Sequence, residues 1–244
     1  MKNCKKGFTL IEALLALTIV GIVAALLIPQ FTDSINKKVS GITLGRAVNQ
    51  IELGLQNIIN AANENPNNNG SHVDTLSLIT IDDILENGVQ TPLIYGNTIF
   101  EDLTSFLGIQ KLPDNIMSDY RTRAGSALNG FYTGTFYSFD KLQAYIIFFQ
   151  PFEFGFNINY DKDSIFATVV IDTNGPARPN LRGRDLFLFG ITNGGKLIPA
   201  GSQIAISSQF GALRSTPLAE NGCPNVNGFS CTARVVEDGY KIEY

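Results

Sequence analysis

An almost wholly apolar segment, residues 8–28, limits what this chain can fold into more than any other feature. As an α-helix it would be about 31 Å long, close to the hydrocarbon thickness of a bilayer. The positive-inside rule puts the N-terminus in the cytoplasm, because the segment is preceded by Lys2, Lys5 and Lys6. A cleavable secretory signal is the alternative, but such signals have shorter apolar stretches and a small-x-small site, which is not evident here. We therefore predict a retained membrane-spanning helix.

One residue does not suit a plain anchor, because Glu12 places a carboxylate within the apolar segment. An acidic residue at the centre of a membrane helix costs about 2.5–3.5 kcal/mol on insertion scales. No other residue of the segment is charged. The partner of Glu12 must therefore come from a chain end or from another subunit.

The sequence Lys5-Lys6-Gly7-Phe8-Thr9-Leu10-Ile11-Glu12 resembles the processing site of type IV prepilins and type II secretion pseudopilins. The resemblance implies that a prepilin peptidase cuts between Gly7 and Phe8 and methylates the new amine. It also implies that Glu12 pairs with the Phe8 amine of a neighbouring subunit during assembly. The implied partners are the peptidase, other pilin or pseudopilin subunits and an inner-membrane assembly platform.

The implied organisation has four parts: a leader (1–7), a transmembrane and filament-core helix (8–28), its amphipathic continuation (29–62) and a globular head (63–244). Pro29 predicts a kink or interruption of the helix. Beyond it, apolar residues recur at three- and four-residue steps, which indicates an amphipathic helix packed on the head. They are Ile35, Val39, Ile42, Leu44, Val48, Ile51, Leu55, Ile58 and Ala62.

The head is predicted to be rich in β-structure. Residues 131–139, 142–149, 165–171 and 185–191 are dense in aromatic and β-branched residues, with turn-forming residues between them. One further short helix is expected near residues 99–107. Short successive strands favour an antiparallel sheet packed on the long helix, which is an α+β fold.

Two features of the head indicate local chemistry. Cys223 and Cys231 enclose a segment of turn-forming residues, which suits a small disulfide-closed loop in an oxidising compartment. The region also resembles the C-terminal disulfide region of pilin-like heads, in which a last strand follows. Asp172, Asn174 and Asp185 lie between two predicted strands and offer the oxygen ligands that Ca²⁺ prefers. A polar hairpin turn, with these side chains bonded to nearby backbone, is the alternative.

An enzyme is not expected, because His72 is the only histidine and no nucleophile elbow, phosphate-binding loop or zinc-ligand cluster is present. The net charge of -4 argues against nucleic-acid binding. No cofactor is required, apart from the possible Ca²⁺. The sequence thus predicts a structural subunit of a type IV pilus or type II secretion pseudopilus, in a minor or specialised role. It would be a single-pass inner-membrane precursor that enters a periplasmic or extracellular filament. A tip-located binding module is the alternative.

Overall fold

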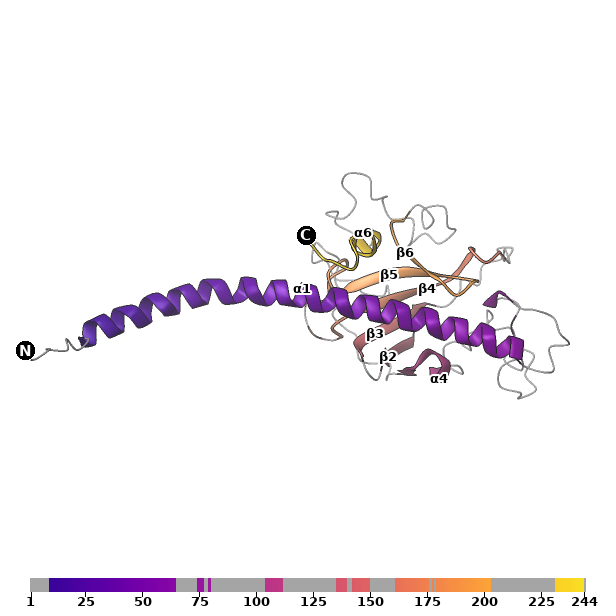
Figure 1. Ribbon diagram of the computed structural model, residues 1–244, viewed down its shortest axis with the longest axis horizontal. Helices are drawn as coiled ribbons and strands as arrows, with labels where there is room; N and C mark the ends of the chain where they lie inside the picture. The colour runs from indigo at the N-terminus through magenta and orange to yellow at the C-terminus, as the bar shows by residue number, and fades with distance from the viewer. Residues whose placement is uncertain are drawn as a thin grey trace, which may run out of the picture.

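A computed structural model describes residues 9–64, 74–76, 79, 104–111, 135–139, 142–149, 161–175, 177, 179–202 and 231–243. Its dominant element is helix α1 (Leu10–Glu64), which has 55 residues. The N-terminal half projects alone, and the C-terminal half lies across the head (Figure 1). The helix continues through Pro29, so of the expected kink or interruption the interruption does not occur. A proline removes one backbone hydrogen bond and tends to bend a helix, and the N-terminal half of α1 curves smoothly in Figure 1.

The described part of the head contains a six-stranded antiparallel sheet in the order β1-β2-β3-β4-β5-β6. The strands are β1 (Ile109–Lys111), β2 (Thr135–Phe139), β3 (Leu142–Phe149), β4 (Ile165–Asp172), β5 (Leu186–Thr192) and β6 (Leu197–Pro199). The antiparallel α+β fold is confirmed. The four predicted strands correspond to β2–β5, whereas β1 and β6 have three residues each and are too short for a sequence pattern. Of the expected short helix, α4 (Thr104–Leu107) lies within the described residues.

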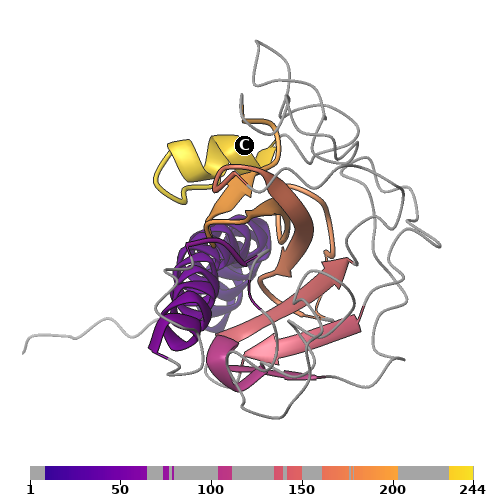
Figure 2. The ribbon, with the colours of Figure 1, turned by 90° about the vertical axis from the view of Figure 1, so that its right-hand side faces the viewer.

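The core forms between one face of α1, helix α4 and one face of the sheet, to which β4 and β5 contribute alternate buried residues. On the helix, Leu44, Ile51, Leu55 and Ile58 recur at three, four and seven residues and are fully buried. On the strands, alternate residues face the helix, as the two-residue period of a strand requires. These are Ala167, Val169 and Ile171 on β4, and Phe187, Phe189 and Ile191 on β5. Figure 2 shows the strands curving around one side of the helix.

The predicted apolar stripe on the helix is confirmed only from Leu44 onward. Ile35, Val39 and Ile42 have side chains 58%, 54% and 59% exposed, so they do not pack on the head. Helix geometry explains the difference, because Ile42 and Leu44 point in directions about 200° apart. The helix therefore has two apolar faces in its middle section, one toward the head and one away from it.

The chain after Cys231 forms helix α6 (Cys231–Glu237), so the expected final strand is wrong. Its valines favour a strand by local preference, but tertiary contacts decide otherwise. The Thr232 hydroxyl accepts a hydrogen bond from Leu188 N (3.1 Å), and Val235 is part of the core. Tyr240 N then bonds to Val235 O (2.7 Å) as the chain enters the left-handed conformation (Tyr240 φ 63°).

The C-terminal segment packs against α1 where two glycines leave room. A Cβ at Gly41 would lie well inside van der Waals contact with the Tyr240 carbonyl group, and one at Gly45 would lie 3.2 Å from the Tyr240 ring. Both glycines are therefore needed for the close approach of helix and C-terminal segment.

We expect Gly41→Ala to destabilise the head by about 1–3 kcal/mol, because the added methyl group must displace the Tyr240 backbone. Gly45→Ala should cost less, because it meets only a side-chain ring. Gly21→Ala is the matched control, since a Cβ there meets nothing within 4 Å. Urea unfolding of the full chain in detergent, followed by tyrosine fluorescence, measures the three. Equal stability of Gly41→Ala and Gly21→Ala would contradict the packing.

Candidate processing and assembly site

Helix α1 begins with a capping box made by Thr9 and Glu12. Glu12 Oε2 accepts hydrogen bonds from Thr9 N (2.9 Å) and Thr9 Oγ1 (2.7 Å), and Glu12 N donates to Thr9 Oγ1 (3.3 Å). This reciprocal pattern satisfies backbone groups that a helix start leaves without partners. The sequence analysis did not assign Thr9 a capping role, although Thr-x-x-Glu before an apolar run is a known signal for a helix N-cap.

The capping box places the Glu12 carboxylate at the positive end of the helix dipole, which favours a negative charge. Both Thr9 bonds go to Oε2. Within the described part of the chain the other oxygen, Oε1, receives no hydrogen bond. The carboxylate is thus held in one position with one oxygen available to a donor. Gly7 and Phe8 lie outside the described residues, so cleavage between them and pairing of Glu12 with a Phe8 amine stay predictions.

No described residue of the head covers the apolar half of α1. Its most apolar window has a mean hydropathy of 2.7, and none of that window is buried within the molecule. Leu10, Leu17, Leu26 and Ile28 have side chains 81%, 70%, 67% and 61% exposed. The helix is long and apolar enough to cross a bilayer. A core helix of a soluble domain would instead be mostly buried by its own fold.

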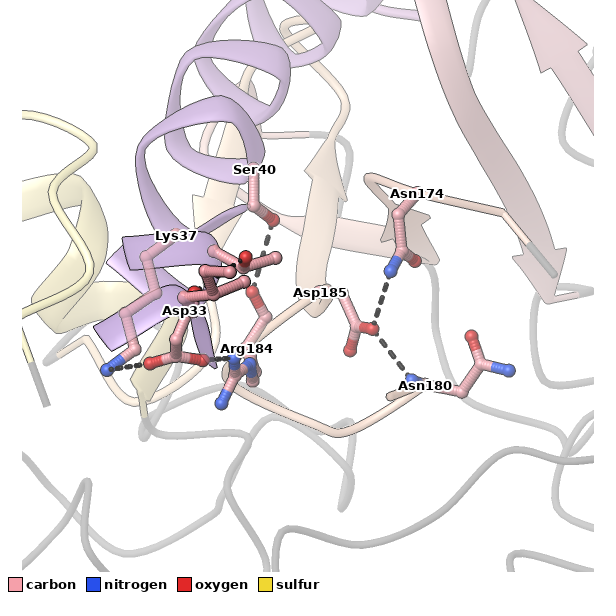
Figure 3. A network of polar contacts seen from close by, with 9 residues as sticks. Asp33, Lys37, Ser40, Asn174, Asn180, Arg184 and Asp185 are labelled. Carbon is pink, nitrogen blue, oxygen red and sulfur yellow. Dashed lines mark hydrogen bonds and ion pairs between the residues drawn. The ribbon is translucent and has the colours of Figure 1, made fainter. Parts of the chain in front are cut away.

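Two of the calcium candidates, Asn174 and Asp185, are hydrogen-bonded to each other in the β4–β5 loop (Figure 3), and the third, Asp172, is the last residue of β4 before the loop. Asp185 Oδ2 accepts bonds from Asn180 N (2.7 Å) and Asn174 Nδ2 (3.1 Å), and Oδ1 accepts from Leu181 N (2.5 Å). Asp172 Oδ1 accepts from Asn174 N (3.1 Å) and Gly175 N (2.9 Å). Both carboxylates hold the backbone of the loop in place. This arrangement favours the polar-turn interpretation, because Ca²⁺ would have to compete with these N–H donors, and calcium stays an untested prediction.

Asp185 is 2% exposed, and its burial raises the pKa of the carboxyl to about 6. Hydrogen bonds from Leu181 N, Asn180 N and the Asn174 amide act in the opposite direction, but the loss of solvent around the charge is the larger effect.

The same loop attaches to the middle of α1. Arg184 forms an ion pair with Asp33, which also pairs with Lys37 one turn along the helix (3.2 Å). The Ser40 hydroxyl donates to Arg184 O (3.1 Å) and is hydrogen-bonded to the Thr173 hydroxyl. Figure 3 shows the contacts of Arg184 with Asp33 and with Ser40, which lie near each other on α1.

Cys231 is buried at the start of α6 and is disulfide-bonded. Cys223 lies outside the described residues, as does His72. The pairing of Cys223 with Cys231 therefore stays a prediction.

A family model for the prokaryotic N-terminal methylation motif matches residues 2–28. This confirms the resemblance to the N-terminal motif of type IV pilins and pseudopilins. The motif implies processing by prepilin peptidase and assembly with other pilin subunits, and it fits an inner-membrane-anchored precursor. No curated protein and no solved structure matches the chain. The comparison thus identifies the N-terminal methylation motif at the start of α1, and it covers no residue of the head.

The raised pKa of Asp185 predicts a pH dependence of stability. Because the folded chain binds this proton more tightly than the unfolded chain, whose aspartates have a pKa of about 3.9, protonation stabilises the fold. The contribution is complete below about pH 4 and is lost as the pH rises through about 6.

The stability of the natural chain relative to Asp185→Asn should therefore fall by up to about 3 kcal/mol between pH 4 and pH 8. Urea unfolding at several pH values measures this, with the exposed Asp161→Asn as the control. A relative stability that rises with pH would mean that the N–H donors outweigh burial.

Proposed function

We propose that this protein is a structural subunit of a type IV pilus or of a type II secretion pseudopilus. The observation that carries the proposal is the prepilin-type motif at residues 2–28 leading into an apolar helix half that the head leaves bare. The precursor is held in the inner membrane by this half. After processing, the same surface becomes the part that packs against other subunits.

The exposed apolar surface supports both stages. Lipid covers it while the subunit is in the membrane, and only other apolar helices can cover it outside lipid. The exposed Ile35, Val39 and Ile42 extend this surface beyond residue 28 by about 21 Å of helix. The apolar surface is therefore longer than an anchor alone needs, as expected of a helix that also packs in a filament.

The capped Glu12 supports the proposed assembly step. Cleavage after Gly7 creates an ammonium on Phe8, and Glu12 has one carboxylate oxygen held ready by the Thr9 bonds to the other. A neighbour's Phe8 amine supplies the opposite charge that a carboxylate in an apolar surrounding requires. Correct pairing thereby fixes the axial position of one helix against the next.

We further propose a minor or specialised role, because the head (63–244) is larger than a minimal pilin needs. In this role the subunit leaves the membrane through an assembly platform and resides in a periplasmic or extracellular filament. The Cys223–Cys231 disulfide would close a loop beside α6 in that oxidising compartment.

Processing is tested by intact mass and N-terminal sequence of the chain from membranes, with and without a prepilin peptidase. We expect a chain that begins at N-methyl-Phe8 only when the peptidase is present. A chain that keeps Met1–Gly7 with the peptidase present, or one cut after the apolar segment, would exclude the proposed function.

Assembly is tested by Glu12→Ala and Thr9→Val, scored by recovery of the subunit in sheared filaments. We expect normal cleavage, with assembly lowered at least tenfold by Glu12→Ala and less by Thr9→Val, because ion pairing within apolar surroundings is worth at least about 1.4 kcal/mol. Thr18→Val is the matched control, since the Thr18 hydroxyl bonds only to Leu14 O of its own helix (2.8 Å). Assembly of Glu12→Ala at the level of Thr18→Val would rule out the pairing.

A further inference from the structure

Helix α1 contacts the head at two positions, near Asp33 and from Ser40 onward. Within the described residues, Asp33 is the first side chain of α1 that contacts the head, through its ion pair with Arg184. The next contacts begin at Ser40, followed by Gly41 and Leu44. Two attachments separated by about two helical turns thus join α1 to the head.

The two attachments differ in chemistry. The Arg184 and Asp33 side chains are 32% and 39% exposed, so water and salt reach the ion pair. Charge pairs of this kind are weak and are screened by salt. Ser40 is 8% exposed, and Gly41 lies against the Tyr240 backbone. The second attachment rests on buried hydrogen bonds and close packing, which salt hardly affects.

The helix is locally weak just before the first attachment. Pro29 has no N–H to donate to the preceding turn. Three residues later the Thr32 hydroxyl bonds back to Ile28 O (2.9 Å), a contact that tends to bend helices. Residues 29–32 lie between the apolar segment and Asp33, the first described side chain of α1 that contacts the head.

We propose that the Arg184–Asp33 ion pair is a releasable latch that sets the length of a hinge in α1. With the latch closed, the hinge is residues 29–32, and the head is held close to the end of the apolar segment. With the latch open, the hinge extends through residues 33–39 to Ser40, and the head gains freedom to reorient relative to the membrane helix. Lys37 keeps Asp33 paired when Arg184 leaves, which lowers the barrier to opening.

The test is hydrogen exchange with mass spectrometry on the full chain in detergent micelles. Because exposed ion pairs are worth little, we expect Arg184→Ala to speed exchange of residues 33–39 about two- to fivefold. Residues 44–58, which are packed on the sheet, should be unchanged. Lys162→Ala is the matched control, since it removes an exposed ion pair to Asp74 (2.8 Å) that does not involve α1.

Two further measurements separate a latch from a general loosening of the head. The exchanged pair, Asp33→Arg with Arg184→Asp, made together with Lys37→Ala so that no like charge lies one turn away, should restore slow exchange of residues 33–39. Salt at 1 M should bring the natural chain to the rate of Arg184→Ala and leave that variant unchanged. An unchanged rate in Arg184→Ala, an equal effect of Lys162→Ala, a failure of the exchanged pair or the absence of a salt effect would each overturn the latch.

Discussion

The structure depends on the packing of the C-terminal half of α1 against α4 and the sheet, in which the buried faces of β4 and β5 meet the helix. Leu44, Ile51, Leu55 and Ile58 have no exposed surface, and the inward residues of both strands meet them in one core. A sheet face of this kind is stable only when another layer covers it. Here the covering layer is the C-terminal half of α1. The N-terminal half of the same helix is apolar enough to cross a membrane. The anchor and the layer that covers the sheet are therefore parts of one continuous helix, Leu10–Glu64.

Polar side chains of α1 complete this joint by bonding to turns of the head. Gln56 Nε2 donates to Gly194 O (2.6 Å), and Glu52 Oε1 accepts from Leu197 N (2.8 Å). The buried Asp172 and Asp185 likewise stabilise the β4–β5 loop, because their carboxylate oxygens accept hydrogen bonds from its backbone N–H groups. Buried polar groups need such partners, because an unmade hydrogen bond costs more than a made one contributes. The loop is thereby fixed in the shape that brings Arg184 and Thr173 to the helix.

Two acidic residues of α1, Glu12 and Asp33, each place a negative charge beside apolar surface, and they are stabilised in different ways. At the start, Glu12 is tied to Thr9 and keeps one oxygen for a partner outside the chain. In the middle, Asp33 finds its partners within the chain, in Lys37 and Arg184. The first charge is arranged for association with another molecule, and the second for holding the head. This division agrees with a subunit whose N-terminal half assembles and whose C-terminal half carries a domain.

The sequence by itself determined the long helix, its apolar half, the processing motif around Gly7 and Phe8, and strands β2–β5, because each depends on local composition and period. Tertiary structure decided the rest. Ile35, Val39 and Ile42 match the helical period as well as Leu44 does, and only the position of the sheet shows which residues it covers. Cys231–Glu237 favours a strand locally but forms a helix, because Thr232 and Val235 are bound to the sheet. Asp33 and Arg184 are 151 residues apart, so no sequence pattern predicts their contact.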